Sequence, residues 1–210
     1  MKEKEIERLI KIKEIEKDLY NKGFKNICGI DEAGRGPLAG PVVVAGVIMP
    51  EDSMIEGIND SKKVTEKRRE KLYDIIKEEA ISYSIAVIDH NVIDEINILN
   101  ATKQGVTDVV DGLDVKPDLI IVDALTHINT RGIPYEPIVK GDAKCYNIAA
   151  ASILAKVTRD RIMRQWDEIY PQYGFASHKG YGTAKHISAI KEYGLCPIHR
   201  RTFTKHFTNG

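Results

Sequence analysis

GIDEAGRGPLAGP, residues 29–41, is the stretch that decides the fold of this 210-residue chain. A short β-type run at residues 26–30 leads into it, and Pro41 leads out of it into a β-branched run at residues 42–49. Glycines after a strand can resemble a dinucleotide-binding fingerprint, but that fingerprint requires a helix directly after the glycines. A strand follows here instead, which argues against a nicotinamide-dependent oxidoreductase.

Outward from this stretch, the hydrophobic pattern predicts a mixed sheet. Further strands are expected at residues 81–89, at the wholly apolar run 119–122, and near 137–140. Helices are expected at residues 3–20, 65–80 with Thr65 as N-cap, 90–112, from about 143 past 164, and 183–193. Three early strands followed by alternating helix and strand predict an α/β fold, a mixed five-stranded sheet flanked by helices, with a helical C-terminal part and an extra N-terminal helix.

The composition suits one globular domain. Hydrophobic residues make up 42% and charged residues 30% of the chain, and no apolar run reaches the ~18 residues of a membrane helix. The densely charged N-terminus does not resemble a secretory signal, so a cytoplasmic location is expected, with no membrane partner. The three cysteines, Cys28, Cys145 and Cys196, are scattered, which favours reduced thiols over a disulfide or metal site.

Charge is unevenly distributed although the net charge is zero. Residues 143–210 carry 11 Lys and Arg against 4 Asp and Glu, whereas residues 23–142 carry 13 against 21. Acids can hold cations and a basic surface can hold phosphates, as a metal-dependent nuclease requires. By itself, such an uneven distribution of charge more often reflects a solvated surface than a binding site.

Four acids stand where strands end or a helix begins. Asp31 and Glu32 end the first predicted strand, Asp123 ends the apolar run 119–122, and Asp142 precedes the long helix. We expect the first strand to break at Glu32, so that both of its carboxylates can serve one site. Oxygen-only ligands suit Mg²⁺ or Mn²⁺, and two such ions ~4 Å apart could support phosphodiester hydrolysis. The alternatives are solvated strand ends and, for Asp142, a helix N-cap.

The glycines also suggest what such a site recognises. Gly34, Arg35 and Gly36 offer backbone donors and acceptors open to close approach, which suits detection of a ribose 2′-hydroxyl. Tyr181 lies on a glycine-flanked loop where its ring could face a sugar. From the residues alone, partial burial is the preferred interpretation of that tyrosine.

Basic residues are the candidates for phosphate contacts. Ser61 and Lys62 combine a hydroxyl and an ammonium group near the start of the helix at residue 65. Further candidates are Lys156, Arg159, Arg161 and Arg164 along the long helix, and His199, Arg200 and Arg201 near the C-terminus. Each cluster alone is more typical of a solvated face, and together they suggest a duplex-binding surface.

From about residue 25 to about 204, the chain resembles the ribonuclease HII family. The segments that carry the resemblance are GIDEAGRGPLAGPVV, NDSKKVTEKRR, IVDA, KGDAK, AAASILAKVTRDR, PQYGFASHKGYGT and HRRTF. Several segments in the same order are far more specific than one motif. The resemblance implies a ribonuclease H-like catalytic domain at residues 23–210, preceded by a helical extension at residues 1–22.

The resemblance also implies a chemistry for these residues. Asp31, Glu32, Asp123 and Asp142 match the four acidic metal ligands of the family, which uses Mn²⁺ or Mg²⁺. Gly34, Arg35 and Gly36 match its motif for the 2′-hydroxyl, and Tyr181 matches a tyrosine that stacks on the adjoining deoxyribose. The implied activity is cleavage of RNA–DNA hybrids, and cleavage on the 5′ side of single ribonucleotides in duplex DNA.

The expected partners are therefore RNA–DNA hybrids and ribonucleotide-containing DNA, acted on by a monomer in DNA repair and primer removal. No sliding-clamp motif is identified in the sequence. Two rivals remain for the carboxylates. A transposase or junction resolvase would lack the Gly-Arg-Gly loop and the tyrosine, and a non-catalytic binding module would not need four acids.

Overall fold

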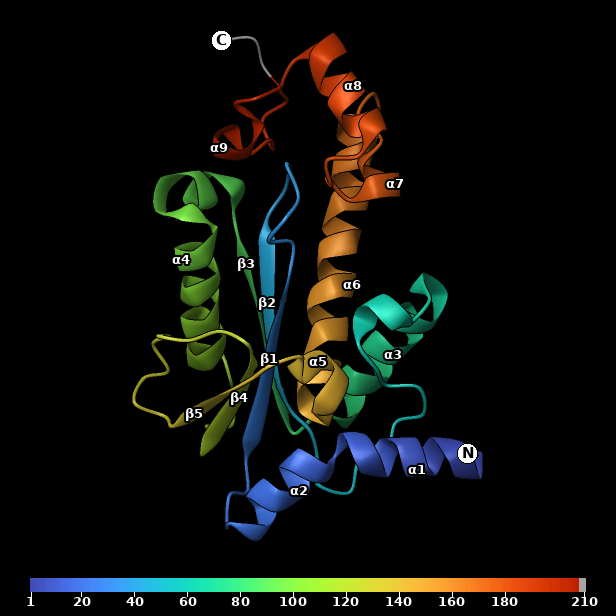
Figure 1. Cartoon of the computed structure of the whole chain (residues 1–210), viewed down its shortest axis with the longest axis vertical. Helices are drawn as coiled ribbons and strands as arrows, with labels where there is room; N and C mark the ends of the chain where they lie inside the picture. The colour runs from blue at the N-terminus through green and yellow to red at the C-terminus, as the bar shows by residue number, and fades with distance from the viewer. Residues whose placement is uncertain (208–210) are drawn as a thin grey trace.

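The computed structural model describes residues 1–207, with a five-stranded sheet at its centre in the order β3-β2-β1-β4-β5 (Figure 1). β2 pairs antiparallel with β1 and β3, whereas β4 lies parallel to β1 and β5. The strands are β1 (Ile27–Ala33), β2 (Val42–Ile48), β3 (Ser82–Ile88), β4 (Leu119–Asp123) and β5 (Tyr135–Ile138). The predicted mixed sheet is confirmed.

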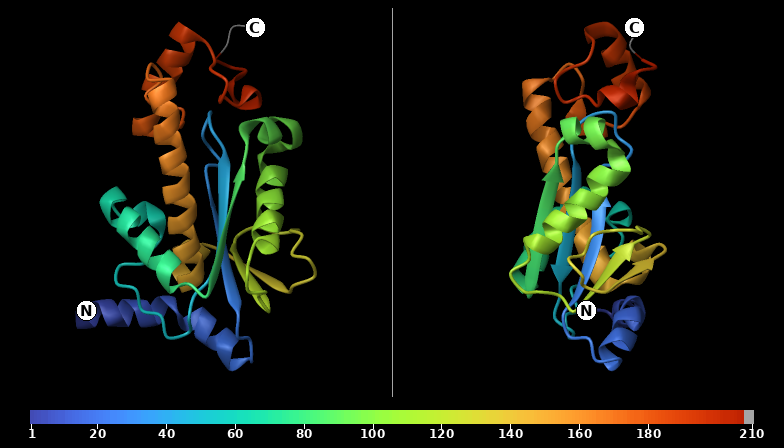
Figure 2. Two further views of the ribbon diagram at one scale, coloured as in Figure 1. Left: turned by 180° about the vertical axis from the view of Figure 1, so that it is seen from behind. Right: turned by 90° about the vertical axis from the view of Figure 1, so that its left-hand side faces the viewer.

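Helices cover both faces of the sheet. They are α1 (Glu3–Ile12), α2 (Glu14–Asn21), α3 (Glu66–Glu79), α4 (His90–Asp111), α5 (Gly141–Lys144), α6 (Tyr146–Ile169), α7 (Phe175–His178), α8 (Ala184–Tyr193) and α9 (Arg201–Thr204), with a short 3-10 helix, η1 (Ser61–Lys63). Figure 2 shows α6 and α3 on one side of the sheet and α4 on the other. Each side has its own apolar core against β2.

Close packing of α6 on β1 explains one glycine of the opening motif. A Cβ on Gly29 would lie 2.3 Å from the backbone carbonyl carbon of Asn147. The small residues Ala149, Ala150 and Ala151 continue this contact surface and are fully buried. This close approach fixes the start of α6 beside the middle of β1.

The N-terminal and C-terminal helices lie at opposite ends of the sheet. Figure 1 shows α1 and α2 below the sheet, and α7, α8 and α9 above it. The predicted N-terminal helix is in fact two helices, which meet at Lys13. Leu9 and Ile12 of α1 join the apolar core under α6, so this extension is packed against the rest of the molecule.

Several element boundaries differ from the prediction. β1 continues through Glu32 to Ala33, so the predicted break at Glu32 is wrong; the turn comes at Gly34, whose φ is +101°. Thr65 is the N-cap residue of α3 as predicted, but its side chain makes no capping hydrogen bond. Asp142 lies in the first turn of α5 and is not its N-cap, a position that Lys140 holds. Among the described helices, none is long and apolar enough to span a membrane.

Candidate active site

Neighbouring parallel strands bring the acids of two distant segments together. Ile30 of β1 is in register with Val122 of β4, so Asp31 and Asp123 follow at adjacent positions of the sheet. The backbone N–H of Gly141 donates to Asp123 Oδ1 at 2.8 Å, which places the start of α5 beside β4. Asp142 is the next residue. One edge of the sheet therefore presents acids from β1, β4 and α5.

These carboxyl groups repel one another in a partly dry environment. Burial raises the pKa of Asp31 well above its usual value, and the charges of Glu32, Asp123 and Asp142 raise it further. Burial also raises the pKa of Glu32, opposed by the Arg35 guanidinium. The pKa of Asp142 is raised by burial and then by its acidic neighbours. Burial of like charges is costly unless a cation compensates it.

Two basic side chains already approach the cluster. Lys62 Nζ lies 3.5 Å from Asp142 Oδ2, and Arg35 Nη1 lies 3.4 Å from Glu32 Oε1. The Lys62 side chain is 79% exposed, whereas Ser61 is buried, so Lys62 is the member of that pair able to reach a phosphate. Asp60, which was not predicted as a site residue, adds a fifth acid near Asp142. The sequence feature that could have identified Asp60 was its position directly before Ser61.

The donor set fits a hard divalent cation. Only carboxylate oxygens are offered, which suits Mg²⁺ or Mn²⁺ more than zinc. Within residues 1–207, no three His, Cys, Asp or Glu side chains are gathered closely enough to form a ready metal site. A cation would offset the mutual repulsion that raises the pKa of Asp31, and drawing the acids together would complete its coordination.

The glycine loop and the tyrosine loop meet, although 145 residues separate them in the sequence. A Cβ on Gly36 would lie 3.7 Å from Cε1 of Tyr181, whose side chain is 45% exposed. Leu38 N–H donates to the carbonyl oxygen of Gly180 at 2.8 Å, which ties the two loops together. The structure thus brings Gly36 and Tyr181 close together.

Gly34 serves a different purpose from Gly36. A Cβ on Gly34 would lie 2.1 Å from Nε of Arg159, inside the protein. The expectation that all three residues of the loop are open to close approach is therefore correct for Gly36 and wrong for Gly34. Arg159 occupies that space.

Comparisons with known proteins show the family of this chain. A profile of the ribonuclease HII family matches residues 28–209. The chain belongs to the ribonuclease HII family. It is 58% identical over 205 residues to ribonuclease HII of Acetivibrio thermocellus, covering 98% of this chain and 80% of that protein. It is therefore a ribonuclease H endonuclease, which acts on the RNA of RNA–DNA hybrids.

Two solved structures share the fold. Ribonuclease H2 from Pyrococcus horikoshii superposes with a TM-score of 0.73 at 27% identity, covering 88% of this chain and all of that one. The ribonuclease HII of Archaeoglobus fulgidus, solved in complex with PCNA, gives a TM-score of 0.72 at 27% identity, covering 88% of this chain and 97% of that one. The sheet and its helices are therefore a ribonuclease H-type fold.

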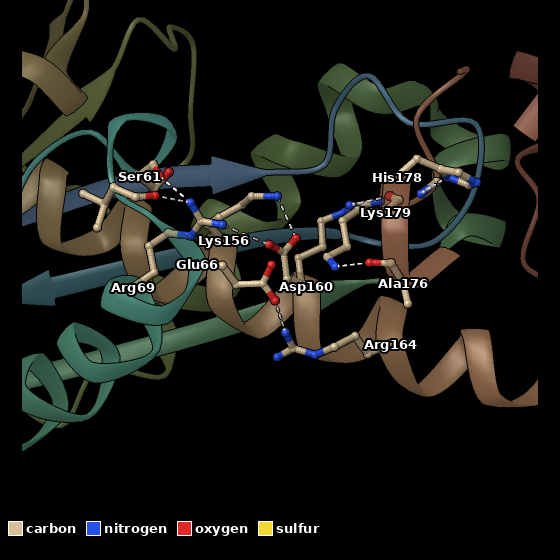
Figure 3. A network of polar contacts seen from close by, with 12 residues as sticks. Ser61, Glu66, Arg69, Lys156, Asp160, Arg164, Ala176, His178 and Lys179 are labelled. Carbon is tan, nitrogen blue, oxygen red and sulfur yellow. Dashed lines mark hydrogen bonds and ion pairs between the residues drawn. The ribbon is translucent and has the colours of Figure 1, made fainter. Parts of the chain in front are cut away.

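The basic residues of α6 in this ribonuclease HII chain already have partners within the protein. Lys156 Nζ pairs with Asp160 Oδ1 at 2.7 Å, and Arg161 pairs with Glu70 at 2.6 Å (Figure 3 shows the Lys156–Asp160 pair). Arg164 binds both Glu66 and Glu70. Lys156, Arg161 and Arg164 already have acidic partners on α3 or α6. Arg159 is buried, so its predicted contact with phosphate is wrong, while phosphate contacts by the other three stay a prediction.

The C-terminal basic cluster is also largely internal in this ribonuclease HII. Arg200 and His199 are buried, and only Arg201 is exposed. His199 and His186 share a hydrogen bond of 3.0 Å between their Nε2 atoms, and burial lowers the pKa of each to about 4. His186 Nδ1 lies 3.0 Å from the carbonyl oxygen of Tyr181. The pair is neutral at pH 7 and supports the tyrosine loop.

Proposed function

We propose that this ribonuclease HII cuts duplex DNA on the 5′ side of a single embedded ribonucleotide, as well as the RNA strand of hybrids. The observation that carries this proposal is the proximity of Gly36 to the ring of Tyr181. Gly36 follows the turn at Gly34, which comes directly after the acids at the end of β1. A backbone loop suited to a 2′-hydroxyl and a ring suited to the next sugar therefore flank the acidic edge.

Asp31, Glu32, Asp123 and Asp142 would hold Mg²⁺ or Mn²⁺, and two such ions would activate water and neutralise the departing 3′-oxygen. The chain's own groups hold the substrate around that position. Lys62 and Arg35 extend from the rim of the acidic edge and can pair with backbone phosphates. Tyr181 provides an exposed ring for the deoxyribose that follows the ribonucleotide.

Residue roles follow from burial and charge. Asp31 is the most buried of the four acids, at 7% exposure, so it gains most from a bound cation. Cleavage would leave a 3′-hydroxyl and a 5′-phosphate, products suited to the repair of ribonucleotides in DNA and to primer removal. We expect the protein to act as a cytoplasmic monomer.

A labelled DNA duplex with one ribonucleotide tests the proposal. The wild type, Asp31→Asn and Asp123→Asn are incubated with Mg²⁺ or Mn²⁺, with an all-DNA duplex and a chelator as controls. We expect one cut, 5′ of the ribonucleotide, only with metal, and loss of activity by at least about 1000-fold in both variants. Cleavage of all-DNA duplex would indicate a resolvase-like activity, and binding without any cleavage would overturn the proposal.

A further inference from the structure

Two buried arginines from distant parts of the chain hold the same loop. Arg159 extends from the middle of α6 and is 1% exposed; Arg200 immediately precedes α9 and is fully buried. In the described chain their two guanidinium groups make seven hydrogen bonds, all to backbone carbonyl oxygens. Six of these seven bonds go to residues between Gly34 and Pro41.

Arg200 determines which way the peptide groups of the glycine loop face. Its guanidinium donates to the carbonyl oxygens of Gly34 at 2.6 Å and of Arg35 at 3.0 Å. In a trans peptide the C=O and the following N–H point in opposite directions. Because both carbonyls turn inward to Arg200, the N–H groups of Arg35 and Gly36 turn away from it, on the side free to donate to a ligand.

Arg159 determines the spacing between the two recognition loops. It donates to Pro41 at 2.9 Å and to Ala39 at 3.0 Å on the glycine loop. Its third bond, at 2.9 Å, goes to the carbonyl oxygen of Lys179, two residues before Tyr181. One rigid planar group therefore connects the loop that carries Gly36 to the loop that carries Tyr181.

The burial of these two arginine charges lowers the stability of the folded state. Burial lowers the pKa of Arg159 to about 10 and that of Arg200 to about 9, which shows that each charge is poorly solvated. Apolar side chains of similar size often fill such positions at lower cost. An apolar residue, however, would leave several carbonyl groups unbonded and free to rotate. The arginines are thus suited to fixing loop geometry.

We propose that Arg200 and Arg159 are positioning residues for ribose recognition. Arg200 directs the N–H groups of Arg35 and Gly36 toward the 2′-oxygen of the ribonucleotide, and Arg159 holds Tyr181 at the distance of the next sugar. The inference rests on the proposed function, because it concerns substrates that carry one ribonucleotide within DNA. Neither arginine touches the substrate; both act through the loop.

Arg200→Lys is the first test, because it keeps the charge but cannot span four carbonyl oxygens with one ammonium group. We expect kcat/KM on the single-ribonucleotide duplex to fall about 100-fold with Mn²⁺, as for a displaced recognition group. In a chelator, the preference of the protein for that duplex over all-DNA duplex should disappear, while affinity for all-DNA duplex stays at the wild-type level. Arg164→Lys, on the surface of α6, is the matched control and should behave as wild type.

Chemical rescue provides a second test that does not depend on how a lysine fits. Arg200→Ala should regain at least tenfold of its lost activity in methylguanidinium but not in methylammonium, which has the same charge without the planar fork. If Arg200→Lys cuts as fast as wild type, or if affinities for both duplexes fall in parallel, Arg200 only stabilises the fold and the inference fails. If the wild type itself shows no cut at the ribonucleotide, the proposed function fails instead.

Discussion

Gly34 and Gly36 lie two positions apart in the sequence, and their surroundings give them different physical roles. Gly34 has a φ of +101°, and the Arg159 side chain fills the space where a Cβ would stand. Gly36 has neither constraint, and its nearest neighbour in that direction is the ring of Tyr181. Gly34 is therefore required by the fold, whereas Gly36 is open to a ligand.

Alanine at these two positions should separate stability from recognition. We expect Gly34→Ala to lower the free energy of unfolding by about 1–3 kcal/mol, because of backbone strain and the clash with Arg159. Gly36→Ala should unfold at the wild-type temperature but cut the single-ribonucleotide duplex at least about tenfold more slowly, because its methyl group would stand where the ribose approaches. Thermal unfolding and cleavage assays on both variants check this. Equal effects on stability would contradict it.

At the scale of elements, α6 connects most of the functional features. Its first turn lies against β1, its middle supplies Arg159, and its start is capped by the N-terminal extension. Glu16 of α2 is 1% exposed, and its Oε1 accepts a hydrogen bond of 2.9 Å from the N–H of Asn147. A carboxylate at the first turn of a 24-residue helix interacts favourably with the helix dipole.

The sequence predicted α6 but not which of its faces is buried. The sequence assigned Arg159 to a phosphate-binding surface, although it lies on the buried face of α6. Ala155, Arg159 and Met163 follow one another at helical spacing, and all three are buried. This spacing was a sequence signal that Arg159 lies on the buried face of the helix. Two of the three backbone carbonyls that bind Arg159, those of Ala39 and Pro41, come from a loop more than 100 residues away, and no local pattern could indicate them.

Glu16 should make stability depend on pH around neutrality. Burial raises the pKa of Glu16 to about 7 from an ordinary value of 4.5. The folded protein therefore binds more protons than the unfolded chain between these values, and the free energy of unfolding falls as pH rises through this window. Glu16→Gln should reduce that fall by up to about 3 kcal/mol, measured by denaturant unfolding at pH 5 and pH 8. Glu14→Gln, on the exposed side of α2, is the control and should leave the pH dependence unchanged.

At the scale of the whole molecule, much of the excess positive charge of the C-terminal part is used internally. Arg159 and Arg200 bind carbonyl groups, while Lys156, Arg161 and Arg164 bind acids of α3 and α6. The charge asymmetry in the sequence therefore overstated the surface available to phosphates. Lys62, whose Nζ lies beside Asp142, is more exposed than the side chains of Lys156, Arg161 and Arg164.

The salt dependence of duplex binding distinguishes surface cations from internal ones. Each cation that replaces counterions on B-DNA contributes about −0.9 to the slope of log K against log salt. Lys62→Ala should therefore reduce the magnitude of that slope by about 0.9, because an exposed ammonium group loses its phosphate. Arg164→Ala should leave the slope unchanged, because its guanidinium is already neutralised by Glu66 and Glu70. Fluorescence anisotropy with an all-DNA duplex in a chelator provides the measurement. An equal change in both variants would mean that α6 faces the duplex and that its ion pairs open when DNA binds.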